Sequence, residues 1–243
     1  MLAIFRKELN TFFSSLIGYI AITIFLVANG LFAWVFPETN ILDDGYATLD
    51  SFFSFAPWIF MFLIPAVTMR SFAEEKSSGT IEFITTKPVT DLQIILGKYF
   101  SAFVLVLFSI LPTITYYFTI RALASPVGNV DTGGIIGSYI GLSLLGASFV
   151  AISIFTSSIS SNQIVAFIGG MFACFFFYVA FDSLSLIPQF VGSADKYFNA
   201  LSINRHYQNI SKGYIDLRDV VYFISIISVF LLMTKTALSS RKW

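Results

Sequence analysis

Apolar residues dominate the chain in six long runs, which short polar stretches separate. Each run comes close to the roughly 20 apolar residues that a helix needs to cross the hydrocarbon core of a membrane. We therefore predict an all-α integral membrane protein. Its six transmembrane helices are expected at about residues 16–36, 52–70, 99–120, 135–156, 164–181 and 220–238.

Prolines and small residues distinguish some of these runs. Pro57 and Pro65 in the second run and Pro112 in the third would kink their helices, which neighbouring helices can tolerate. The fourth run carries small residues at spacings that let helix backbones approach closely, namely Gly137, Ser138, Gly141, Gly146 and Ala147. We expect this run at a helix interface, although glycine is also generally frequent in membrane helices.

The stretch after the fifth run is expected to form a long loop, residues 182–219. Its first part, residues 184–191, is again apolar but contains Pro188. It is too short to be a separate span, so we expect a broken or re-entrant continuation of the fifth helix.

The first 15 residues predict an amphipathic helix. Apolar side chains recur at helical spacing on one side, and polar ones fill the other: Leu2, Phe5, Leu9, Phe12 and Phe13 against Arg6, Lys7, Glu8 and Asn10. Such a helix suits the membrane interface, where it would form an elbow before the first span. A cleaved signal peptide is the alternative, but the apolar run is long and no small-residue cleavage site follows it.

The polar connector between the second and third runs, residues 71–98, is the most informative segment. We expect the second helix to continue through Lys76 and to end at Gly79, which can adopt a left-handed turn. Thr80 can then cap a short helix, and Pro88 breaks it. Thr90 and Gln93 stand at capping-box spacing and predict the start of the third helix.

The short helix, residues 81–85, has an apolar side formed by Ile81, Phe83 and Ile84, with Glu82 beside it. An apolar helix face of this kind can lie in a groove of a soluble partner protein. A solvated loop is the alternative.

Composition agrees with a membrane protein, because 56% of the residues are hydrophobic, only 12% are charged and the mean hydropathy is +0.81. The net charge of zero, without a basic run, makes nucleic acid an unsuitable partner. The single cysteine, Cys174, rules out an intramolecular disulfide or a multi-cysteine metal site. We expect it to be a packed or lipid-facing small residue.

Candidate chemistry is sparse. Gly97-Lys98 falls short of a phosphate-binding loop, because Tyr99 replaces the required Ser or Thr and Leu92 stands where the first glycine belongs. His206 is the only histidine, and we expect a surface residue in the long loop. No metal site or catalytic residue is predicted, so the chain is not expected to be an enzyme.

Basic residues favour an orientation in which both termini are cytoplasmic. With that orientation the inner side holds Arg6, Lys7, Arg70, Lys76, Lys87, Lys98, Arg241 and Lys242, against Arg121, Lys196, Arg205, Lys212 and Arg218 outside. The first outer loop is purely acidic, with Glu38, Asp43, Asp44 and Asp50. The link between the fourth and fifth runs, residues 157–163, should lie inside but is uncharged.

The connector residues Glu74 to Glu82, followed by Thr86-Lys87-Pro88-Val89 and Gly97-Lys98, resemble the segment between the second and third spans of ABC-2 type permeases. Residues 6–15 are similar to the elbow of that family, although Leu16 stands where many members have proline. Within the family, the phenylalanine-rich spans and the stretch Asn204-Arg205-His206-Tyr207 are most similar to the permease subunit associated with gliding motility.

The resemblance implies a membrane subunit that works with two cytoplasmic ABC ATPase subunits and a second permease copy or homologue, and possible partners include a further envelope subunit. ATP and magnesium would bind to the ATPase, the location would be a bacterial inner membrane, and no cofactor is expected in this chain. The residues implied in ATPase coupling are Glu74, Glu75, Gly79, Thr80, Ile81, Glu82, Phe83 and Pro88; those of the elbow are Arg6, Lys7, Glu8 and Phe12. The alternative function is a membrane scaffold or anchor that moves no solute.

Overall fold

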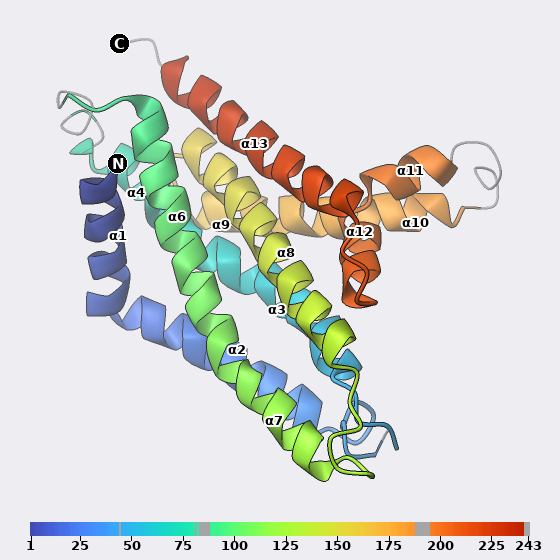
Figure 1. Ribbon diagram of the computed structural model, residues 1–243. Helices are drawn as coiled ribbons and strands as arrows, with labels where there is room; N and C mark the ends of the chain where they lie inside the picture. The colour runs from blue at the N-terminus through green and yellow to red at the C-terminus, as the bar shows by residue number, and fades with distance from the viewer. Residues whose placement is uncertain (44, 81, 83–87, 188–194, 241–243) are drawn as a thin grey trace.

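The computed structural model describes residues 1–43, 45–80, 82, 88–187 and 195–240, and every regular element in these ranges is a helix (Figure 1). Five helical stretches are long and apolar enough to cross a membrane, namely Asp50–Ser77, Asp91–Leu123, Thr132–Ile159, Gln163–Ser185 and Leu217–Ser239. A sixth candidate is the bent pair of α1 (Leu2–Ser14) and α2 (Leu16–Trp34). The predicted all-α membrane fold with about six spans is confirmed.

The elbow forms because the chain turns sharply between α1 and α2. Ser15 adopts an extended backbone, and the two helices meet at 65°. Gly18 is needed at this corner, since a Cβ there would lie 2.5 Å from the carbonyl oxygen of Phe12. As a result α1 packs against the beginning of α6 (Asp91–Ile110) (Figure 1).

Helix α3 (Asp50–Thr68) continues into α4 (Arg70–Ser77), so the second span runs on into the connector as expected. Pro57 and Pro65 are buried inside α3 without ending it. The third span begins at Thr90 with the predicted capping box, which is confirmed. Near its far end Pro112 lies in a 3-10 turn, Leu111–Thr113, which joins α6 to α7 (Ile114–Leu123).

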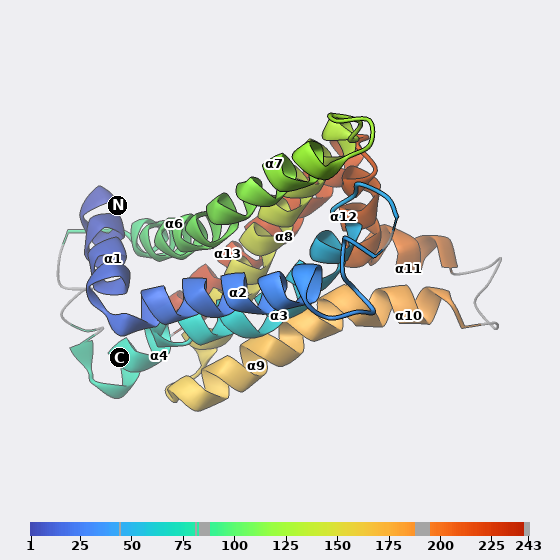
Figure 2. The same ribbon diagram turned by 90° about the horizontal axis from the view of Figure 1, so that it is seen from below.

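Helix α8 (Thr132–Ile159) is the centre of the bundle (Figure 2). In its most apolar window 72% of the residues are buried, against 22% for the span that begins with α9 and 17% for α13 (Leu217–Ser239). The outer spans therefore expose apolar surface of the kind that faces lipid or another subunit.

Small residues allow this central position, as the sequence predicts. A Cβ on Gly146 would lie 2.8 Å from the side chain of Val106 on α6, and one on Gly141 would lie 3.3 Å from the ring of Tyr207. At Gly137 the added atom would meet the backbone of residues 210–213, which cannot rotate away. The expected helix interface along the fourth span is confirmed.

The fifth span consists of α9 (Gln163–Phe175), a π-helical turn (Phe176–Ala180) and α10 (Phe181–Ser185). We expected the span to end at residue 181, but it continues through Asp182. The carboxylate of Asp182 accepts a hydrogen bond from Asn204 Nδ2 at 3.1 Å and pairs with Arg205 Nε at 3.8 Å, so its charge is compensated within the fold. Most of the expected continuation, including Pro188, lies outside the described residues.

The expected long loop contains two further helices, α11 (Asp195–Leu201) and α12 (Ile203–Ser211). Tyr207 on α12 is buried and donates a hydrogen bond to the carbonyl oxygen of Phe53 at 2.7 Å. Figure 2 shows α1, α4 and the end of α13 at one end of the bundle, which we call the connector end, and the links α2–α3 and α7–α8 at the opposite end.

Replacing Gly137 by alanine should destabilise the protein. The added Cβ would lie 2.5 Å from the carbonyl oxygen of Ile210 and 3.1 Å from Cα of Gly213, and backbone atoms cannot rotate away. We expect a loss of about 1–3 kcal/mol, the usual cost of overpacking. Thermal unfolding in detergent measures it, with Gly169→Ala as the control, because the nearest atom there is 4.0 Å away. Equal melting temperatures for the two variants would contradict the close packing of α8 on α12.

Candidate functional site

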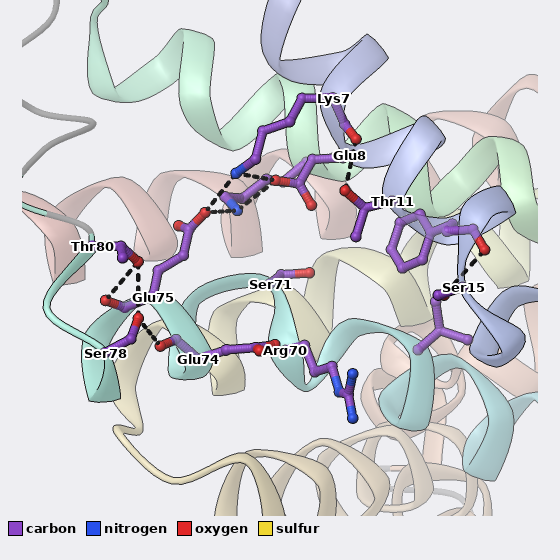
Figure 3. Close-up of a pocket in the computed structure, with 13 residues that line it drawn as sticks. Lys7, Glu8, Thr11, Ser15, Arg70, Ser71, Glu74, Glu75, Ser78 and Thr80 are labelled. Atoms are coloured by element: carbon purple, nitrogen blue, oxygen red, sulfur yellow. Dashed lines mark hydrogen bonds and ion pairs between the residues drawn. The ribbon is translucent and has the colours of Figure 1, made fainter.

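Four charged side chains from three elements meet at the connector end (Figure 3). Lys98 on α6 is 2% exposed, and its ammonium lies 3.0 Å from Glu8 Oε1 on α1 and 2.8 Å from Glu75 Oε1 on α4. Lys7 adds a second cation, 3.5 Å from Glu8 and 3.4 Å from Glu75. We call this group the Lys98 cluster.

The Lys98 cluster is electrically neutral, with two cations and two carboxylates. Neutrality matters because an unpaired charge inside a protein costs several kcal/mol. The ammonium of Lys98 also lies 5.2 Å from the ring centre of Phe72, within the range of a cation–π contact. Burial by itself lowers the pKa of Lys7, but Glu8 and Glu75 outweigh it, and the pKa is raised above its usual value.

Helix α4 is also held by the end of α8. The hydroxyl of Ser157 accepts hydrogen bonds from the backbone N–H groups of Phe72 at 3.1 Å and Ala73 at 3.2 Å, and it donates to the carbonyl oxygen of Met69 at 2.9 Å. A side chain inserted into the helical ladder explains the break between α3 and α4. Lys76 Nζ donates to the carbonyl oxygen of Ser158. The uncharged link after the fourth span therefore has a basic residue of α4 against it.

The remaining connector residues face outward. Glu74 is exposed and makes no ion pair in the part of the chain that the structure describes. Gly79 has φ +70°, so the predicted left-handed turn is confirmed. The hydroxyl of Thr80 points back to the end of α4, 2.9 Å from Ser78 Oγ and 3.4 Å from the carbonyl oxygen of Glu75. Glu82 and Pro88 are exposed.

The short helix expected at residues 81–85 lies outside the described residues, and so do the side chains of Ile81 and Phe83. The structure thus brings Glu75, Lys7 and Glu8 into one cluster and places Glu74, Gly79 and Thr80 on the outward side of the same stem. Phe12 is buried beside them and Arg6 is exposed.

One expectation about the elbow needs correction, because Glu8 is not on a solvated face. It is buried at 9% exposure and faces Lys98. The sequence contains a signal for this: the neighbours of Glu8 at helical spacing, Ile4 and Phe12, are apolar, so the residue falls on the apolar side of α1.

The same signal identifies Lys98, which the sequence pattern places at the end of the polar connector. It is the eighth residue of α6, and Ile94, Ile95 and Ala102 share its side of the helix. Ser157 carried no comparable signal, because serine is common in links between helices.

His206 also differs from expectation. It lies on α12 with a side chain only 15% exposed, its ring stacks on Tyr222 with centres 3.9 Å apart, and Nδ1 is 2.5 Å from Asp219 Oδ1. Nε2 lies 3.1 Å from the carbonyl oxygen of Ala200. Because a carbonyl oxygen only accepts, Nε2 carries a proton. The His206 ring therefore links α11 to α13. This second polar cluster has a structural role.

Cys174 is fully buried beside Ser153, as a packed small residue. Within the described ranges no group of His, Cys, Asp and Glu side chains is arranged to hold a metal ion.

Comparison with known proteins adds one finding. Residues 37–235 match the family described as ABC-2 family transporter protein, and this range includes α4, α6 and the link between them but not α1. A search of curated proteins found no significant match.

Replacing Lys98 by methionine should strongly destabilise the protein, since two buried carboxylates lose their central cation. We expect a loss of about 3–5 kcal/mol, the cost of breaking a buried ion pair by removing one partner. Thermal unfolding in mild detergent measures it, with Lys235→Met on the exposed side of α13 as the control. The triple variant Lys98→Met, Glu8→Gln, Glu75→Gln should recover most of the loss. A triple variant no more stable than the single one would show that charge balance is not what the cluster provides.

Proposed function

The chain belongs to the ABC-2 family of transporter proteins, a family of membrane permease subunits, and we propose that its connector is the element on which a separate cytoplasmic ATPase acts. In this proposal ATP and magnesium bind to the ATPase. The permease works in a pair, with a second copy or a homologue, in a bacterial inner membrane. The connector end faces the cytoplasm.

The attachment of α4 carries the proposal. This stem of the connector is bonded to α1 and α6 through the Lys98 cluster and to α8 through Ser157, and it continues directly from α3. A displacement of the connector is therefore passed to four helices at once. A helix attached in this way transmits a displacement to the spans better than a solvated loop would.

In this proposal the two faces of α4 have different roles. Glu75 faces inward and links the stem to Lys98, whereas Glu74 is exposed, as are Glu82 and Pro88 beyond the Gly79 turn. We assign docking of the ATPase to the outward residues together with Ile81 and Phe83, and transmission to Glu75. Thr80 and Gly79 set the direction in which the connector leaves α4.

A finer assignment, to the gliding-motility subgroup, is proposed on the stretch Asn204–Tyr207. Its side chains bond α12 to α3 through Tyr207, to α10 through Asn204 and Arg205, and to α13 through His206. Disruption of the gene in a gliding bacterium tests this assignment, and normal gliding by the mutant would remove it.

Docking is tested by changing the outward residues of the connector. The double variant Glu82→Ala, Phe83→Ala should lower co-purification with candidate ATPase subunits by at least about tenfold, because interface aromatics and charges commonly contribute more than 1 kcal/mol each. Stimulation of ATP hydrolysis by the permease should fall in parallel. Unchanged binding and unchanged stimulation would overturn the docking role. Retained binding with no stimulation or transport in the unmodified protein would favour a scaffold.

Two glycines with nearly the same backbone conformation test coupling against simple strain. Gly79 has φ +70° and Gly45 has φ +71°, and neither has an atom within 4 Å of an added Cβ. Alanine at either position should cost about 1–2 kcal/mol of backbone strain. Only Gly79→Ala should lower stimulated ATP hydrolysis, since Gly45 lies at the opposite end of the bundle. Equal effects on hydrolysis would argue against a special role of the connector turn.

A further inference from the structure

A cavity of about 360 Å³, lined mostly by polar and charged residues, lies between α1 and the α3–α4 junction (Figure 3). Charged groups form one side of it, and Phe12 and Val67 form an apolar part of its wall. The cavity lies beside the amphipathic elbow, and such helices occupy the level of lipid headgroups.

An apolar groove lies next to this cavity. It has a volume of about 390 Å³, and Val67 lines both spaces. Its walls are apolar side chains of α2, α3 and α9, namely Ile20, Ala21, Ile24, Ile59, Phe62, Leu63, Ala66, Val67 and Phe167. A cavity with charged walls beside an apolar groove, at the depth of the interface, matches the two parts of an amphiphile whose head lies at the membrane surface.

The charges around the cavity select the kind of head. The lining includes three cations, Lys7, Arg70 and Lys98, and three anions, Glu8, Glu74 and Glu75, so it is neutral overall. A neutral lining favours a zwitterion over an anionic lipid, which would add an uncompensated charge.

Two groups in this lining lack partners in the described part of the chain. Glu75 Oε2 is buried without a hydrogen-bond donor, and the guanidinium of Arg70 makes no ion pair. A guanidinium matches a phosphate with two parallel hydrogen bonds, and a primary ammonium offers three donors to carboxylates. A quaternary choline offers none.

We propose that the cavity and groove bind one phosphatidylethanolamine molecule of the adjoining leaflet. Arg70 holds the phosphate, Glu75 Oε2 holds the ammonium, and an acyl chain lies in the groove beyond Val67. The lipid is a resident ligand that fills the space between the elbow and α3. This site does not depend on the proposed ATPase coupling.

The test is lipid retention by the full chain in the absence of any ATPase. The protein is equilibrated with vesicles that contain equal amounts of dioleoyl phosphatidylethanolamine, phosphatidylglycerol and phosphatidylcholine, extracted in mild detergent and examined by native mass spectrometry. We expect preferential retention of one phosphatidylethanolamine. Arg70→Gln should lower its occupancy by about fivefold or more, because one phosphate contact is lost. Arg121→Gln is the matched control, since that arginine is also exposed and without an ion pair but ends α7 at the opposite end.

The groove is tested separately with Ala66→Phe, which fills it, against Ala237→Phe, which adds the same bulk to a half-buried position on α13. Only the first should lose the lipid. Equal retention of the three lipids, or unchanged retention in Arg70→Gln, would overturn the proposal. Loss of ATPase binding by Arg70→Gln with lipid retention unchanged would assign Arg70 to a protein contact instead. If a variant fails to fold, the unmodified protein can be tested after its lipids have been removed. Its melting temperature should rise when phosphatidylethanolamine is added and should not rise with phosphatidylglycerol. The same melting temperature with both lipids would overturn the proposal.

Discussion

The ammonium of Lys98 lies inside the protein, and the arrangement of the connector end depends on its compensation. A buried ammonium without partners would cost several kcal/mol, so the fold must bring carboxylates to it. Glu8 and Glu75 come from α1 and α4, far from Lys98 along the chain. The elbow and the connector stem are therefore placed by the same cation. Lys7 then balances the second carboxylate and keeps the group neutral.

Local patterns predicted much of this fold. The apolar runs indicated the spans, the Thr90–Gln93 spacing indicated the start of α6, and Gly79 indicated the left-handed end of α4. These features depend on residues within a few positions of one another, so their physics is present in the sequence. The small residues of the fourth run likewise predicted an interface, though not that its partners would be α6 and α12.

The candidate site was harder to predict because its contacts are long-range. The family resemblance implies a coupling role for Glu75, and Lys7 lies on the polar side of the predicted elbow helix. Lys98 stands at the end of the polar connector, where a charge is usually solvated. Which charge pairs with which depends on how α1, α4 and α6 meet, and no local pattern specifies that. The role of Ser157 was even harder to predict, because its hydroxyl bonds to α4 only after α8 has packed against that helix. Apolar neighbours at helical spacing were the one local sign of the buried charges.

The break between α3 and α4 also defines the length of the helix that can move relative to α3. Helix α4 has eight residues, so at a rise of about 1.5 Å per residue it extends about 12 Å beyond Met69, where the chain leaves α3. Near its base the backbone N–H groups of Phe72 and Ala73 donate to the hydroxyl of Ser157 on α8. A rotation of α4 by about 20° about Met69 would move its far end by roughly 4 Å, about three quarters of the rise of one helical turn. A displacement of the connector can therefore change the angle between the short helix α4 and the long helix α3 at Met69.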